Sequence, residues 1–164
     1  MKVLLSALVL AAAPAFAATA VVGQPAPAFS VTDTSGKAVS LADFKGKTVV
    51  LEWVNPGCPY VRKHYDSANM QATQKGAAGQ GVVWLAVNST AQEHYDYKKP
   101  ADMAAWMQSQ KAAATHTLMD SDGKIGKAYG ARTTPHMYVV DAKGTLAYAG
   151  GIDDKRSANP EDVK

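Results

Sequence analysis

The stretch Val49–Tyr65, VVLEWVNPGCPYVRKHY, decides the fold and contains the only cysteine of the chain, Cys58. The residues from Thr48 to Val54 are apolar and β-branched, which is typical of a buried strand. A tight turn is expected at Asn55–Gly57, and Pro59 suits the first turn of a helix, where its missing N–H is not needed. The pattern therefore predicts a strand, a turn and a helix that begins at the cysteine.

Residues 1–17 have the features of a signal peptide. Lys2 gives a positive start, Val3–Ala13 is an apolar run broken only by Ser6, and Pro14–Ala17 ends in a small-x-small pattern. The run is shorter than the roughly 20 residues that a membrane-spanning helix needs. We therefore expect cleavage after Ala17, a periplasmic or secreted protein and no membrane association afterwards. A retained signal anchor is the weaker alternative.

The remaining residues, 18–164, are expected to form a single domain, because the chain has no internal repeat and no long linker. Hydrophobic residues make up 47% of the chain and charged residues 19%, an ordinary globular balance. The formal net charge is +3 and the basic residues are scattered, so no nucleic-acid partner is expected.

A single cysteine is unusual in an exported protein, where cysteines normally form disulfides. No disulfide within this chain is possible, which favours a functional role for Cys58, with a buried, inert thiol as the alternative. At the start of a helix, the sulfur lies near free backbone N–H groups and the positive end of the helix dipole, and both favour the reactive thiolate. The helix is predicted from Pro59 to about Gln74, with Cys58, Arg62 and Tyr65 on one face.

Strands and helices alternate along the rest of the chain. Two short strands, Phe29–Thr32 and Ala38–Leu41, predict an N-terminal β-hairpin around a turn at Asp33–Lys37. The alternation predicts an α/β fold with a central mixed β-sheet flanked by helices, in which a closing hairpin adds antiparallel strands. The further elements expected are strands at Val82–Val87, Thr117–Met119, His136–Val140 and Thr145–Ala149, and helices at Ala101–Ala114 and Ile125–Tyr129.

Three segments carry a family resemblance: PAPAFSVTDTSGKAVSLADFKGKTVVLEW (25–53), NPGCPY (55–60) and ARTTPHMYVVDAKGTLAYAGGID (131–153). With this layout, the chain resembles the thioredoxin-like superfamily from about Gly23 to Asp153. It is most similar to the redoxin branch, which includes the alkyl hydroperoxide reductase/thiol-specific antioxidant (peroxiredoxin-like) proteins. The resemblance implies a thioredoxin-like fold.

The resemblance also assigns a role to Cys58. Against the thioredoxin pattern CxxC, Cys58 matches the first, attacking position and Val61 stands where the second cysteine would be. In peroxiredoxin-like proteins the matching cysteine attacks peroxide and follows a Pro-x-x-x-Thr/Ser-x-x-Cys pattern. Here Leu51 replaces the proline and Asn55 replaces the Thr/Ser, although an asparagine can still donate a hydrogen bond to a peroxide oxygen.

Two arginines are candidates for stabilising the thiolate. Arg62 lies one turn along the predicted helix from Cys58, and an exposed surface arginine is an equal alternative. Arg132 precedes Thr133–Pro135, a segment that in similar proteins packs beside the active cysteine. Its guanidinium could hold the leaving hydroxide of a peroxide.

The resemblance also predicts that the Thr134–Pro135 bond is cis and faces the sulfur. Thr134 would then present backbone groups to a substrate disulfide or thiol. This feature is more typical of disulfide-handling members of the superfamily. Tyr60 flanks the site and could line a substrate pocket, or could equally belong to the core.

Other polar residues are weaker candidates. Glu52 could relay protons near the cysteine, but an outward-facing strand-end glutamate is the favoured interpretation. The histidines show no metal-ligand spacing, so no metal or other cofactor is expected. Copper binding by Cys58 with His64 or His136 is a minor alternative.

The main hypothesis is an exported thiol-based oxidoreductase with antioxidant, peroxide-reducing activity. Cys58 would become a sulfenic acid and be reduced by an external thiol. The alternatives are thiol–disulfide exchange through mixed disulfides, and a non-catalytic thioredoxin-fold binding module. Similar proteins end in a helix that covers one sheet face, whereas this sequence stops at residues 162–164. We therefore expect either a fragment or an uncovered face.

Overall fold

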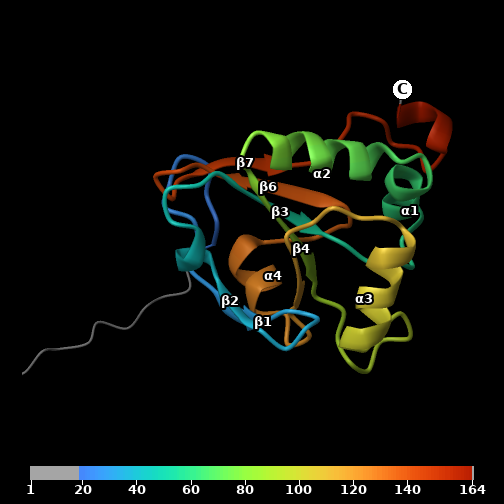
Figure 1. The fold of residues 1–164 in the computed structure, drawn as a ribbon, viewed down its shortest axis with the longest axis horizontal. Coiled ribbons are helices and arrows are strands. Elements are labelled where there is room, and N and C mark those ends of the chain that lie inside the picture. Colours follow the sequence, from blue (N-terminus) through green and yellow to red (C-terminus); the bar gives the residue numbers. More distant parts are fainter. Residues whose placement is uncertain (1–18, 164) are drawn as a thin grey trace, which may run out of the picture.

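The computed structural model describes residues 19–163, and a five-stranded mixed sheet lies at its centre. Its strands are arranged in the order β5-β4-β3-β6-β7 (Figure 1). Strands β3, β4 and β5 run parallel, and β6 and β7 add two antiparallel pairings. All five residues of β3 are buried, as expected for a central strand. The strands are β3 (Val49–Trp53), β4 (Val83–Asn88), β5 (His116–Met119), β6 (His136–Val140) and β7 (Leu146–Gly150).

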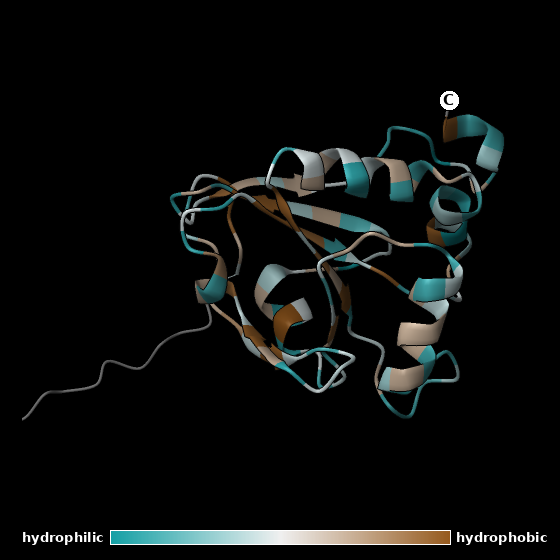
Figure 2. Ribbon diagram, in the orientation of Figure 1, coloured by the Kyte–Doolittle hydropathy of each residue, from teal (hydrophilic) through white to brown (hydrophobic). Residues whose placement is uncertain are grey.

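Helices cover both faces of this sheet, and α2 and α4 lie on opposite sides of it (Figure 1). One apolar cluster joins α4 to the sheet through aromatic residues that include Trp53, Tyr129 and Tyr138. The other cluster joins the sheet to the helices α1, α2 and α3. The apolar segments that face these clusters are drawn in brown in Figure 2. The helices are α1 (Pro59–Asp66), α2 (Asn69–Gly79), α3 (Pro100–Ser109) and α4 (Lys124–Tyr129).

The N-terminal hairpin forms a separate two-stranded sheet of β1 (Ser30–Thr32) and β2 (Ala38–Ser40), as predicted. Asp33 organises its turn, because Oδ1 accepts hydrogen bonds from the backbone N–H groups of Ser35 and Lys37. The other oxygen, Oδ2, lies 2.9 Å from His116 Nδ1 on β5. Burial raises the pKa of Asp33, but these hydrogen bonds outweigh it and lower the pKa to about 2. The turn thus fastens the hairpin to the edge of the central sheet.

The single helix predicted from Pro59 to about Gln74 is wrong, because the structure has two helices there. Helix α1 ends at Asp66, and Ala68 has a φ of 60°, in the left-handed region. Ser and Asn flank this position, and both residues disfavour a helix interior. The break lets α2 turn its own apolar side toward the sheet, where Met70 is completely buried.

The predicted signal peptide, residues 1–17, lies outside the described residues. Within residues 19–163, no helix is long and apolar enough to cross a membrane. Two short 3-10 helices complete the fold, η1 (Leu41–Phe44) and η2 (Pro160–Val163). The latter lies beside α1 (Figure 1).

Candidate active site

Cys58 lies where the sequence places it, at the residue that caps the N-terminus of α1. Its backbone N–H donates to the carbonyl of Asn55 at 3.0 Å, which closes the turn after β3. Pro59 occupies the first turn of the helix. The cysteine is half-buried and its thiol is free. Its sulfur is therefore held at a junction of strand and helix without being sealed inside the protein.

The segment before β6 reaches the sulfur from the other side. The Thr134–Pro135 peptide bond is cis, which confirms the prediction. The thiol of Cys58 donates to the carbonyl oxygen of Thr134, with an Sγ–O distance of 3.1 Å. Sheet pairing explains this approach, because Trp53 at the end of β3 lies opposite His136 at the start of β6. The proline segment must therefore lie next to the turn that holds the cysteine.

The side chain of Asn55 is engaged in holding the turn. Its Oδ1 accepts from the backbone N–H of Gly57 at 2.8 Å, and its Nδ2 lies 3.4 Å from Oδ2 of Asp96. Asp96 belongs to the loop between β4 and α3 and packs directly on Gly57, where a Cβ atom would lie 2.5 Å from its carboxylate. The amide of Asn55 thus joins the turn to that loop. Among the described residues, no hydrogen bond links this amide to the sulfur of Cys58.

Arg62 is directed to solvent, beside Asp66. Its side chain is 63% exposed, and Nε is 3.9 Å from Oδ2 of Asp66 one turn further along α1. Tyr65, which was expected on the same helix face, is only 2% exposed. The boundary between core and solvent therefore runs between these two residues, and α1 directs Arg62 outward.

Arg132 lies close to the proline segment, as expected. It lines a cavity of about 240 Å³ together with Asn55 and Thr134. Burial and the nearby charge of Arg132 lower the pKa of His136. Arg132 thus shares a cavity with Thr134, whose carbonyl oxygen accepts the hydrogen bond of Cys58.

Tyr60 and Pro135 line a second cavity, of about 320 Å³, whose wall also includes Thr134. Tyr60 is 45% exposed, so it belongs to the surface around the site and not to the core. Thr134 lines both cavities. Three of the predicted residues, Cys58, Thr134 and Pro135, are thus brought together, with Arg132 and Tyr60 in the adjoining cavities.

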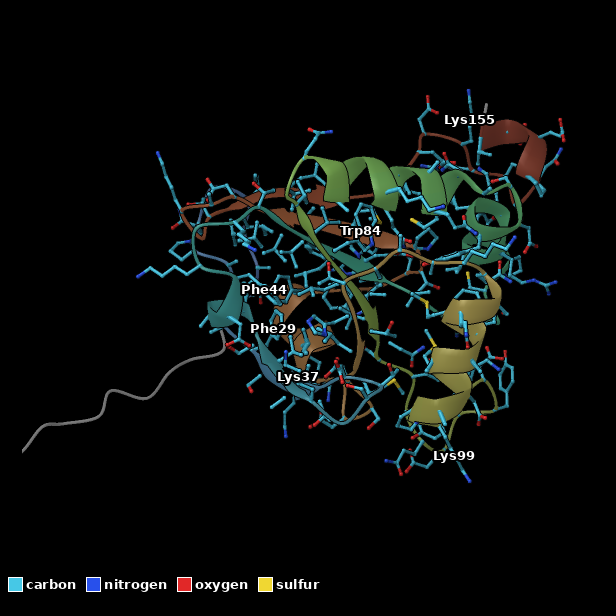
Figure 3. The ribbon with its side chains drawn as sticks, in the orientation of Figure 1. Phe29, Lys37, Phe44, Trp84, Lys99 and Lys155 are labelled. Carbon is cyan, nitrogen blue, oxygen red and sulfur yellow. The ribbon has the colours of Figure 1, made fainter. Side chains whose placement is uncertain are left out.

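Glu52 faces the interior, so the outward orientation that we favoured is wrong. It is completely buried, and its carboxylate accepts hydrogen bonds from Tyr65 Oη at 2.9 Å, Trp84 Nε1 at 2.7 Å and Gln74 Nε2 at 3.1 Å. Figure 3 shows Trp84 in the interior of the molecule. Burial raises the pKa of Glu52 to about 7, against the opposing effect of these hydrogen bonds. The three donors come from other elements, so no local pattern could reveal them.

A second polar cluster, which the sequence analysis did not identify, lies in the wall of the larger cavity. Lys63 Nζ is 2.7 Å from Oδ2 of Asp153, and His64 Nε2 is 3.3 Å from the same oxygen. The other ring nitrogen of His64 lies 2.8 Å from Asn69 Nδ2, so both nitrogens are occupied. Burial lowers the pKa of His64, partly offset by the charge of Asp153. This cluster attaches the segment after β7 to α1.

Within the part of the chain that the structure describes, no group of three or more His, Cys, Asp or Glu residues is arranged to hold a metal ion. His64, one partner of the copper alternative, is already bound through both nitrogens. The group at this site with nucleophilic chemistry of its own is the thiol of Cys58.

Sequence and fold comparisons relate the chain to known proteins. Residues 22–149 match the AhpC/TSA family. The chain is 28% identical over 132 residues to the thiol-disulfide oxidoreductase ResA of Bacillus thuringiensis subsp. konkukian (strain 97-27), covering 76% of this chain and 66% of that protein. It thus spans just under two thirds of the length of that curated relative.

Two solved structures illustrate the likeness of the fold. An uncharacterized conserved protein from Geobacillus kaustophilus superimposes with a TM-score of 0.76 at 27% identity, covering 87% of this chain and 78% of that chain. The thioredoxin domain of a thiol-disulfide oxidoreductase from Bacteroides vulgatus gives a TM-score of 0.62 at 24% identity, covering 88% and 96% of the two chains. The fold is therefore thioredoxin-like, as expected.

Proposed function

Within the AhpC/TSA family, to which the chain belongs, we propose that it acts as a thiol–disulfide oxidoreductase that works through mixed disulfides of Cys58. The observation that carries this proposal is the hydrogen bond of 3.1 Å between Cys58 Sγ and the carbonyl of Thr134, beside a cis proline. A disulfide that approaches the sulfur must meet the backbone of Thr134. The name of the relative from Bacillus thuringiensis points to the same chemistry.

The exchange needs two steps. The thiolate of Cys58 attacks one sulfur of a substrate disulfide, a new S–S bond forms, and the other half of the substrate leaves as a thiolate. An external thiolate then attacks the substrate sulfur of the mixed disulfide and releases Cys58. One substrate disulfide is used and one is formed, so the chain needs no second cysteine.

Peroxide reduction, the main hypothesis from the sequence, has weaker support than this alternative. It required Asn55 and Arg62 at the sulfur, whereas Asn55 is hydrogen-bonded within the turn and Arg62 points outward beside Asp66. Arg132 remains near the proline segment. The partners that we propose are a disulfide substrate and an external thiol reductant, at an extracytoplasmic location suggested by residues 1–17.

The test is to treat the reduced protein with glutathione disulfide or with hydrogen peroxide and to weigh the intact protein over time. We expect one glutathione adduct, located at Cys58, and its removal by added thiol. The Cys58→Ser variant is the control and should gain no adduct. Rapid peroxide consumption without adduct formation would support peroxide reduction instead, and an unreactive thiol would support a binding module.

A further inference from the structure

Two cavities share the segment Thr133–Thr134, whose second residue accepts the hydrogen bond of Cys58. The smaller cavity, of about 240 Å³, has Arg132 in its wall, and the larger, of about 320 Å³, has Arg156. The sulfur is thus hydrogen-bonded to a residue that lines two cavities, each with an arginine in its wall. This arrangement differs from a single pocket beside a cysteine.

Positively charged side chains outnumber carboxylates in the lining of both cavities. Within residues 19–163, neither Arg132 nor Arg156 forms an ion pair with a carboxylate. The carboxylate that borders the larger cavity, Asp153, is already paired with Lys63 at 2.7 Å. Lys155 also borders this cavity, but its side chain points outward (Figure 3). An anionic group that enters either cavity would therefore meet a guanidinium without a competing carboxylate.

We propose that the two cavities bind a low-molecular-weight thiol that carries a carboxylate on each side of its sulfur, and the disulfide of this thiol. One carboxylate would lie at Arg132 and the other at Arg156, with the sulfur between them at Cys58. The planar guanidinium suits this task because it offers paired donors to a carboxylate. The inference rests on the proposed function and identifies the class of its external thiol.

The size of the cavities favours a small ligand. The volume of the smaller cavity, about 240 Å³, lies below the roughly 300–1,000 Å³ that is usual for small-molecule sites, and that of the larger, about 320 Å³, lies at its lower end. In the reaction, the Cys58 thiolate attacks one sulfur of a substrate disulfide, and the other half of the substrate leaves as a thiolate. The bound thiol, as its thiolate, then attacks the substrate sulfur of the mixed disulfide, forms a new S–S bond with it and releases the Cys58 thiolate. The arginines hold the carboxylates throughout and exchange no proton.

The experiment measures the second-order rate of mixed-disulfide formation with three disulfides. The probes are glutathione disulfide, which has carboxylates on both sides of each sulfur, neutral bis(2-hydroxyethyl) disulfide and cationic cystamine. The protein should react fastest with glutathione disulfide. Arg132→Gln and Arg156→Gln should each slow that reaction about fivefold, the effect of a charge pair worth about 1 kcal/mol, and leave the neutral probe unaffected.

Two further variants make the result specific. Lys143→Gln removes one positive charge from an exposed turn beyond β6 and should change none of the three rates. Arg132→Lys keeps the charge but loses the paired donors, so it should recover only part of the glutathione disulfide rate. Equal rates with all three probes, or an equal loss for all three in the arginine variants, would overturn the inference and leave exchange at Cys58 standing. Failure of every disulfide to react would remove the proposed function itself.

Discussion

Glu52 lies on β3 and Cys58 at the start of α1, so both belong to one strand–turn–helix unit. Both lie on the side of the sheet that α1 and α2 cover. The carboxylate of Glu52 is sealed from solvent and accepts three side-chain hydrogen bonds. The thiol of Cys58 is half-buried and has one backbone partner, the carbonyl of Thr134. The two groups therefore differ both in exposure to solvent and in the number of their hydrogen-bond partners.

This difference in burial and hydrogen bonding separates a group suited to react from a group suited to stabilise the core. A buried group with three partners cannot meet a substrate without breaking up the core, whereas a group with one partner at the surface can exchange it for a substrate. We therefore expect changes at Cys58 to affect activity and changes at Glu52 to affect stability.

Replacing the sulfur should have the largest effect. Cys58→Ser should abolish disulfide exchange, because a serine hydroxyl does not attack disulfide sulfur near neutral pH. The hydroxyl can still donate to Thr134, so the thermal unfolding midpoint should stay close to that of the parent protein. The two measurements are adduct formation by mass and unfolding by circular dichroism. Residual exchange in the variant would contradict a mechanism through this cysteine.

Glu52 should make stability depend on pH. Its folded-state pKa, about 7, is raised above the ordinary value of 4.5, so its stabilising contribution is complete below about pH 4.5 and is lost as the pH rises toward 7. Glu52→Gln does not titrate. The free energy of unfolding of the parent protein, relative to this variant, should therefore fall by on the order of 3 kcal/mol across that window.

Urea unfolding at several pH values measures this difference. The effect is distinct from that of Asp33 and Asp153, whose pKa values are lowered by their hydrogen bonds and which therefore lose stabilising contributions in more acidic solution. Both carboxylates are present in the parent and in the variant, so their effects cancel. A difference that stays constant from pH 4.5 to 7 would show that Glu52 does not titrate there.

The turn that holds Cys58 should be sensitive to a single methyl group. Gly57→Ala places a Cβ atom 2.5 Å from the carboxylate of Asp96, so this side chain must give up its position against the turn, or the turn or loop must move, at a cost of up to about 1–3 kcal/mol. Gly76→Ala is the matched control, because that position in α2 has no neighbour within 4 Å. This control should gain about 0.5–1 kcal/mol in helix stability.

Unfolding midpoints of both variants, and exchange rates at Cys58, measure the outcome. Adding Asp96→Ala to Gly57→Ala should restore part of the lost stability, since it removes the group in the way. If the double variant is no better than the single one, the close packing of the loop on the turn is not the cause.

Arg62→Gln should have the smallest effect. The side chain is 63% exposed and makes only a 3.9 Å pairing with Asp66, which is worth no more than about 0.5 kcal/mol on a helix surface. We expect the exchange rate with the neutral bis(2-hydroxyethyl) disulfide to stay within the error of the parent value. A large loss of rate would place Arg62 in the reaction after all and weaken the contrast between the sulfur and its surroundings.

Much of the architecture could be predicted from local patterns. The buried strand, the turn and Cys58 at the start of a helix follow from an apolar run, an Asn-Pro-Gly sequence and a proline in the first helical turn. The order of strands and helices indicated a mixed sheet with helices on both faces. The resemblance added the cis bond before Pro135, which the residues alone did not indicate.

Other features depended on contacts between distant segments. Glu52 was misjudged because its partners, Tyr65, Gln74 and Trp84, come from α1, α2 and β4. Arg62 was assigned a place at the sulfur because helical spacing says which residues share a face, but not where solvent begins. The helix break at Ala68 had only the weak signal of flanking Ser and Asn residues.

By itself, the sequence determined the position of the nucleophile, because strand propensity, turn residues and helix capping act over a few neighbouring residues. Only the tertiary structure decided which groups surround it. Packing brought the Thr134 carbonyl to the sulfur, directed Arg62 away and placed Arg132 and Arg156 in separate cavities. Burial and ion pairing depend on which surfaces meet in the folded protein. Those surfaces are formed by segments that lie far apart in the chain, so local sequence patterns do not reveal them.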